Sequence, residues 1–207
     1  MELQVKPILR MYELTIDQKD RDSFVKEGTH NLLTSHANES GTLAMYATHL
    51  DQAGTKNFVF ELYQSLEQYQ IHANSPQFKQ YGQLAQKVLT GHSMQELQPQ
   101  FLTTDSTDLA VSGENDYVIR MTKLTLPETK VKTFKEDLKR LNLSAAAIYA
   151  ATVDANDFNW IILEVTHLNE LSSALSELIK NESKTSTEQL LKVDTMVSQA
   201  NLKFLNI

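Results

Sequence analysis

Short apolar segments and amphipathic segments alternate along the chain, and the same order of predicted elements occurs twice. The first half is predicted to contain strands at 5–14, 42–50, 57–64 and 97–103, a helix after the first strand and a broken helix at about 65–90. The second half repeats this order, with strands at 117–124, 145–153, 159–166 and 201–206 and a broken helix at 168–199. Each half therefore has the order β-α-β-β-α-β of a ferredoxin-like unit.

Several motifs predict where these helices begin. Residues 15–18 and 125–128 each read Thr-x-x-Gln/Glu, which is a capping box that opens the first helix of each half. A third capping box at 185–188 predicts that the second helix of the second half restarts there. In the first half Ser75-Pro76 marks the restart, because proline suits the first turn of a helix. Phe24, Gly28 and Leu32 recur every four residues and mark one face of the first helix.

The two halves align as a tandem repeat. Residues 8–15 and 118–125 are identical at four of eight positions, at an offset of 110. The offset then falls to 103, where Tyr46 aligns with Tyr149 and Glu61 with Glu164, and Phe101-Leu102 aligns with Phe204-Leu205. A single gap brings both halves into register. We therefore divide the chain into a first unit at 1–104, a polar linker at 105–115 and a degenerate second unit at 116–207.

The strand patterns predict how the units pack. Phe58, Phe60 and Leu62 point to one side of their strand, and Val59 and Tyr63 point to the other, so both faces of the sheet require burial. Helices cover one face, and the sheet of the second unit is the natural cover for the other. The expected fold class is α+β, with two tandem ferredoxin-like units forming an intrachain dimeric α+β barrel. Exchange of units between two chains would bury the same surface, so a homodimer of the tandem chain is an alternative to the intrachain barrel.

Composition narrows the classes of function. The 207 residues carry a net charge of -7, and no basic run offers the face that nucleic acids or anionic membranes require. Cysteine is absent, which excludes disulfides, thiol catalysis and iron–sulfur clusters. No window approaches 18 apolar residues, and 1–6 does not resemble a signal peptide, so we expect a cytoplasmic protein.

Three segments of the first unit resemble the antibiotic biosynthesis monooxygenase family. Asn38-Glu39-Ser40-Gly41 resembles its Asn-Glu-x-Gly turn, and residues 58–63 resemble its third strand. Residues 72–81 resemble its His-x-x-Ser-Pro-x-Phe-Lys segment. The resemblance covers about residues 5–104, whereas the second unit keeps the element order and Glu164 but not these motifs.

This resemblance implies a dimeric α+β barrel with a pocket between sheet and helices. Many members oxygenate quinols or polycyclic phenols with O2 and without metal or flavin, which is feasible because a phenolate itself reduces O2 once it is deprotonated and held. Heme-degrading relatives use an Asn, a Trp and a His where this chain has Tyr12, His72 and Gly82, so heme is not expected. The expected partners are a small aromatic molecule and O2, with no cofactor.

The catalytic candidates are His72 and Asn38. The His72 imidazole titrates near neutral pH and is a candidate proton acceptor, while the alternative role is to fix the helix break at Ser75-Pro76. Asn38 is a candidate donor to a developing oxyanion, although turn formation explains it equally. No metal site is predicted, because the histidines lack the i, i+4 spacing of a zinc helix. The substrate-binding candidates are aromatic residues and one carboxylate: Tyr12, Tyr46, Glu61, Tyr63, Tyr69, Phe78 and Tyr81.

The leading hypothesis is a cofactor-independent monooxygenase acting on a small aromatic or quinol. The alternatives are a non-enzymatic small-molecule binding or stress-response module and an isomerase of a small carbonyl compound. A pocket lined by tyrosines favours the monooxygenase, and one lined by cations favours the isomerase. One competent pocket is expected, in the first unit, because Leu175 aligns with His72 and Lys184 with Tyr81.

Overall fold

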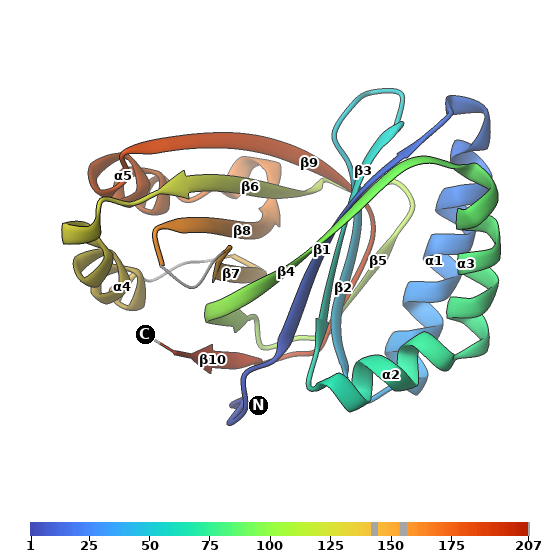
Figure 1. The fold of residues 1–207 in the computed structure, drawn as a ribbon, viewed down its shortest axis with the longest axis horizontal. Helices are drawn as coiled ribbons and strands as arrows, with labels where there is room; N and C mark the ends of the chain where they lie inside the picture. The colour runs from blue at the N-terminus through green and yellow to red at the C-terminus, as the bar shows by residue number, and fades with distance from the viewer. Residues whose placement is uncertain (142–144, 154–156, 207) are drawn as a thin grey trace.

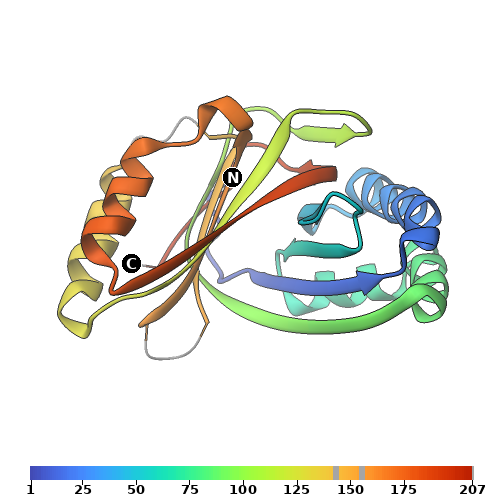
Figure 2. The ribbon, with the colours of Figure 1, turned by 90° about the horizontal axis from the view of Figure 1, so that it is seen from above.

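The computed structural model describes residues 1–141, 145–153 and 157–206, and its central feature is a closed antiparallel β-barrel. Helices cover the barrel on two opposite sides, one side for each half of the chain (Figures 1 and 2). The strands are β1 (Ile8–Ile16), β2 (Thr42–His49), β3 (Lys56–Tyr63), β4 (Leu89–Thr104), β5 (Leu109–Ser112), β6 (Tyr117–Thr125), β7 (Ala147–Thr152), β8 (Asn159–His167), β9 (Thr185–Ser198) and β10 (Lys203–Leu205). The α-helices are α1 (Arg21–Asn38), α2 (Leu66–Asn74), α3 (Pro76–Val88), α4 (Val131–Arg140) and α5 (Ser173–Glu182).

Hydrogen bonds join the strands in the order β1-β3-β2-β9-β6-β8-β7-β4, and β4 returns to β1 to close the ring. Each half supplies four of these strands in the ferredoxin-like order. The long strands β4 and β9 each begin in the sheet of their own half and end beside the other half, β4 on β7 and β9 on β2. The predicted α+β fold, with two tandem units forming a barrel within one chain, is confirmed.

Apolar side chains from all eight strands fill the barrel interior. Phe58, Phe60 and Leu62 lie there, as their alternation predicted, because a barrel of this size is just wide enough for side chains to fill. Tyr46 and Tyr149 meet inside the barrel, with their hydroxyl oxygens 2.6 Å apart. These two residues align at the offset of 103, so the contact joins equivalent positions of the two halves.

A second apolar layer lies between each sheet and its helices. In the first half Phe24 of α1 packs with Val59 and Val88. In the second half Phe134 of α4 packs edge-on against Trp160, with ring centroids 5.3 Å apart. None of the described helices is long and apolar enough to cross a membrane.

The structure corrects the predicted helix starts. Thr15 and Thr125 lie in strands β1 and β6 rather than at helix caps, and each is followed by a short 3-10 turn before the α-helix begins. The capping box at 185–188 is also wrong, because these residues open strand β9. The second half therefore has no counterpart of α3. Lys184 precedes β9 and is not equivalent to Tyr81 of α3.

The last strands were also misaligned. Leu97 of β4 lies opposite Leu9, and Leu191 of β9 lies opposite the equivalent Ile119, so β9 is the counterpart of β4. Strand β10, which contains Phe204, instead pairs with the end of β4, just as β5 pairs with the end of β9. The predicted linker at 105–115 contains β5, and the division of the chain at that segment stays a prediction.

Candidate functional site

A cavity lies between the helices and the sheet of the first half. It is narrow, and the space within it that can hold a water-sized sphere is about 20 Å³. The wall residues come from α1, α3, β2, β3 and the end of β9. They are Phe24, Val25, Gly28, Asn31, Leu32, Ala47, Thr48, Asn57, Val59, Glu61, Tyr81, Asp194 and Thr195. The wall is therefore largely apolar, with a few polar groups and no lysine or arginine among the described lining residues.

Glu61 of β3 is the buried carboxylate of this cavity. Its Oε2 accepts a hydrogen bond of 2.8 Å from the Tyr63 hydroxyl. Burial raises the pKa of Glu61, and the charges of His72 and Arg10 and the Tyr63 hydrogen bond oppose that shift only in part. A carboxyl group with a raised pKa is well suited to accept and return protons near neutral pH.

The equivalent carboxylate of the second half, Glu164, has an arginine partner. Arg120 and Glu164 are cross-strand neighbours, and Arg120 Nη2 lies 2.5 Å from Glu164 Oε2. Arg10 is likewise opposite Glu61, but its guanidinium stacks over the Tyr69 ring at 3.8 Å and lies 3.4 Å from Glu96. No ion pair joins Arg10 to Glu61 within the described residues. Glu61 is therefore available for other chemistry.

His72 lies in the wall behind Glu61 and does not line the cavity. It is fully buried, and its Nδ1 lies 2.9 Å from Glu39 Oε2 and 3.2 Å from Ser35 Oγ. Burial opposes ionisation of Glu39, but hydrogen bonds from His72 and Thr42 outweigh it and lower the pKa of that carboxyl. This cluster joins α1 to α2.

Two consecutive residues of β9 enter the cavity because the strand carries a β-bulge. Ala47 pairs with Thr195 and Thr48 with Val193, which leaves Asp194 without a partner in β2. Val193 faces the barrel interior, and the extra residue turns both Asp194 and Thr195 toward α1. The oxygen Thr195 Oγ1 lies 2.5 Å from Thr29 Oγ1.

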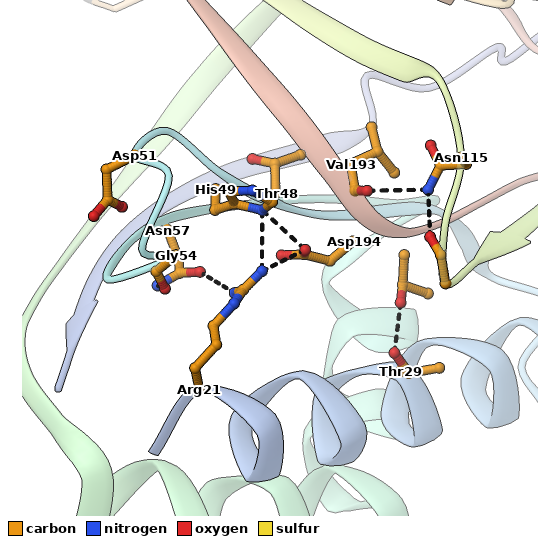
Figure 3. A network of polar contacts seen from close by, with 12 residues as sticks. Arg21, Thr29, Thr48, His49, Asp51, Gly54, Asn57, Asn115, Val193 and Asp194 are labelled. Atoms are coloured by element: carbon orange, nitrogen blue, oxygen red, sulfur yellow. Dashed lines mark hydrogen bonds and ion pairs between the residues drawn. The ribbon is translucent and has the colours of Figure 1, made fainter. Parts of the chain in front are cut away.

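A polar network at the cavity opening binds α1 to this bulge (Figure 3). Asp194 Oδ1 accepts a 2.5 Å hydrogen bond from Arg21 Nη2 and lies 2.9 Å from His49 Nδ1. Arg21 Nη1 also donates to Asn57 Oδ1 at 2.8 Å. Gly54, with a φ of 64°, makes room for this guanidinium, since a Cβ there would lie 2.2 Å from Arg21 Nε. The second half of the chain thus contributes directly to the cavity of the first.

The structure separates the predicted site residues into three groups. Glu61 and Tyr81 line the cavity. Five others form the wall around Glu61 without lining it, namely Tyr12, Tyr63, Tyr69, His72 and Phe78. Asn38 is exposed at the end of α1, where its Nδ2 donates to the Thr34 carbonyl, and Tyr46 lies inside the barrel. The roles predicted for all these residues stay predictions.

Sequence reasoning missed Asn31 and Asp194. Asn31 is 2% exposed, and its Oδ1 has no hydrogen-bond partner within the described residues. It lies on the stripe of Phe24, Gly28 and Leu32, so a polar residue on a predicted buried face was the available signal. Asp194 carried no such signal, because the bulge that exposes it to the cavity depends on the pairing of β9 with β2.

Comparison with protein families identifies the first half. Residues 7–84 match the model of the antibiotic biosynthesis monooxygenase family. The matched span runs from the start of β1 into α3 and includes Glu61, His72 and Tyr81. The first half therefore contains an antibiotic biosynthesis monooxygenase domain at residues 7–84. A search of curated proteins finds no match to the chain.

Solved structures share the fold of almost the whole chain, including both halves. A candidate monooxygenase of Lactobacillus acidophilus matches with a TM-score of 0.83 at 20% identity, covering 96% of this chain and 99% of that one. One of Fusobacterium nucleatum matches with a TM-score of 0.84 at 16% identity, covering 99% and 100%. An anthrone oxidase-like protein matches with a TM-score of 0.51 at 10% identity, covering 95% and 94%. At these identities the likeness concerns the fold.

Proposed function

We propose that the first half is a cofactor-independent monooxygenase that takes a small electron-rich aromatic molecule, such as a quinol, into the cavity beneath α1 and α3. The observation that carries this proposal is the Glu61 carboxylate, which has no ion pair with arginine among the described residues, faces a largely apolar cavity and has a raised pKa. The family match of residues 7–84 supports the same class of reaction. An apolar cavity with a few polar groups is the usual form of a site for a small organic ligand.

In this reaction Glu61 accepts the proton of a quinol hydroxyl group and so generates an electron-rich anion. The anion transfers electrons to O2, one oxygen atom enters the ring, and the other leaves as water. The quinol supplies all four electrons and becomes a hydroxyquinone. Asn31 Oδ1, which is buried and has no hydrogen-bond partner among the described residues, can accept a hydrogen bond from a ring hydroxyl group. His72, in the wall, limits how far burial raises the pKa of Glu61.

The lining also separates the rival functions. A cation-lined cavity would favour the isomerase, whereas the described lining contains no lysine or arginine. This favours an aromatic ligand over the isomerase. Only one of the predicted tyrosines, Tyr81, lines the cavity, and much of the space is narrow. Flanking side chains therefore have to move for a ring to bind.

The test is O2 consumption by the purified chain with a panel of quinols. Glu61→Gln keeps the shape of the side chain but removes the proton acceptor, so it should lower the rate by about 10²–10⁴-fold. Glu164→Gln changes the equivalent residue of the second half and should keep the rate per folded molecule. Full activity in Glu61→Gln contradicts the proposal. Quinol binding without O2 consumption favours the non-enzymatic binding module.

A further inference from the structure

We infer that Asp194, a residue of the second half, determines the specificity of the cavity in the first half. Its carboxylate accepts a hydrogen bond from the second hydroxyl group of a 1,4-dihydroxy aromatic ligand whose first hydroxyl group contacts Glu61. This inference rests on the proposed function for the role of Glu61. It adds a required ligand feature, because an aromatic ring with only one hydroxyl group leaves one of the two carboxylates without a partner.

The identity of Asp194 is not needed to form the bulge. The equivalent bulge occurs in β4, where Ala151 pairs with Pro99 and Ala150 with Phe101, and the unpaired residue is Gln100. Barrel closure therefore uses the same bulge in both halves. Toward the second half the bulge presents a neutral amide and the aromatic ring of Phe101, which packs with the apolar layer there. Of these two bulges, the one in β9 places a carboxylate at the first-half cavity, and the one in β4 places no carboxylate.

The Asp194 carboxylate has one oxygen available for a ligand. Arg21 and His49 both contact Oδ1. Across the described part of the chain, no hydrogen bond to Oδ2 is found, although the side chain is 13% exposed and lines the cavity. Arg21 and His49 hold the carboxylate in place, so Oδ2 is a preorganised acceptor for a hydroxyl group.

The pKa values of the two cavity carboxyl groups are shifted in opposite directions. Burial alone would raise the pKa of Asp194, but hydrogen bonds from His49 and Arg21 and the charge of Arg21 outweigh it and lower that pKa. Asp194 therefore stays ionised and accepts hydrogen bonds, while Glu61, with its raised pKa, exchanges protons. Two carboxyl groups whose pKa values are shifted apart within one site are typical of divided acid–base roles.

The spacing of the strands suits a single ring. Glu61 lies opposite Met45, and Asp194 lies beside β2 between the partners of Ala47 and Thr48. Strand geometry then puts their α-carbons about 13 Å apart, across two strand spacings and between two and three residues along β2. Both side chains reach into the cavity from these positions. Carboxylates at this separation suit a ring with hydroxyl groups at opposite ends, and the flanking side chains have to move to admit it because the cavity is narrow.

The experiment is a calorimetric titration under nitrogen, which measures binding without turnover, with hydroquinone and its monomethyl ether 4-methoxyphenol as probes. The wild type should prefer hydroquinone by at least about tenfold, because the ether lacks one donor. In Asp194→Asn the amide oxygen stays with Arg21, so the NH2 group faces the cavity in place of the acceptor. This variant should lose most of the preference. Gln100→Asn, at the equivalent bulge, should retain it.

The outcomes separate this inference from the proposed function. An Asp194→Asn variant that keeps the full preference for hydroquinone overturns the inference, and so does a wild type that binds both probes equally or binds neither. If hydroquinone binds with a preference that depends on Asp194 but no O2 is consumed in air, the inference stands and the oxygenase proposal fails. If O2 is consumed and the preference does not depend on Asp194, the oxygenase proposal stands alone.

Discussion

At the scale of single residues, the equivalent glutamates of the two halves, Glu61 and Glu164, have different environments. Glu164 contacts Arg120 at 2.5 Å and also accepts a hydrogen bond from the Ser172 backbone. Glu61 lacks an arginine contact because Arg10 turns to the Tyr69 ring. The sequence shows the same Arg and Glu in both halves. What differs is an aromatic residue on α2 that draws the guanidinium away and leaves the carboxylate to the cavity.

The burial of His72 leads to a prediction about stability. His72→Ala removes a fully buried ring that contacts Glu39 and packs against Phe78 at a centroid distance of 4.8 Å. It leaves both a void and an unsatisfied buried carboxylate, so we expect a loss of about 2–5 kcal/mol in the free energy of unfolding. Urea denaturation followed by circular dichroism measures this loss. An unchanged midpoint would show that the His72–Glu39 contact contributes little.

At the scale of elements, the bulge of β9 decides where the polar residues of the second half are placed. It turns two consecutive side chains toward α1, and Arg21, His49 and Asn57 join them there. The network connects the start of α1 to strands of both halves (Figure 3). It therefore holds the helix against the sheet at the cavity opening.

This network predicts a dependence of stability on pH. The folded-state pKa of Asp194 is lowered, so its contribution is complete above the unfolded-state pKa of about 3.9 and is lost as the pH falls below that value. The measurement is the difference in unfolding free energy between the wild type and Asp194→Asn at several pH values. The difference should be largest near neutral pH and shrink in acid. A difference that stays constant down to pH 3 would contradict the role of the carboxylate.

Local patterns predicted the strands better than the helix boundaries. The alternation around Phe58 and Phe60 placed β3 and its two faces correctly, because burial on both sides leaves a clear signal. The capping boxes failed, since Thr15 and Thr125 are held in strand ladders by pairing with distant residues. Strand β9 was wrongly predicted as part of a helix, because the pairing that makes it a strand is also with a distant segment. Its polar first half is stabilised by β6, which lies far away in the sequence.

At the scale of the whole molecule, barrel closure makes the two halves depend on each other while their outer faces differ. Each half completes the ring through one long strand, β4 or β9, so both must keep their interior side chains. The spaces beneath the helices have no such constraint. The first half has α3 and a narrow cavity, whereas the second half, where the structure describes it, has no counterpart of α3 and fills its space with apolar side chains.

The last prediction is that one chain binds one ligand. Trp160 stands at the position of the second half that corresponds to Asn57, because Leu14 pairs with Asn57 and the equivalent Leu124 pairs with Trp160. Its indole is 1% exposed and packs on Phe134, so it occupies the space that is open in the first half.

A ring cannot enter the space between the second-half sheet and its helices α4 and α5 without displacing this side chain, which costs about as much as removing a large core residue, roughly 3–5 kcal/mol. Titration calorimetry with hydroquinone should therefore give a stoichiometry of one per chain. Trp160→Phe, which keeps the site filled, should leave that value unchanged. Two equivalent sites per wild-type chain would mean that the second half opens as readily as the first, and the asymmetric model would fail.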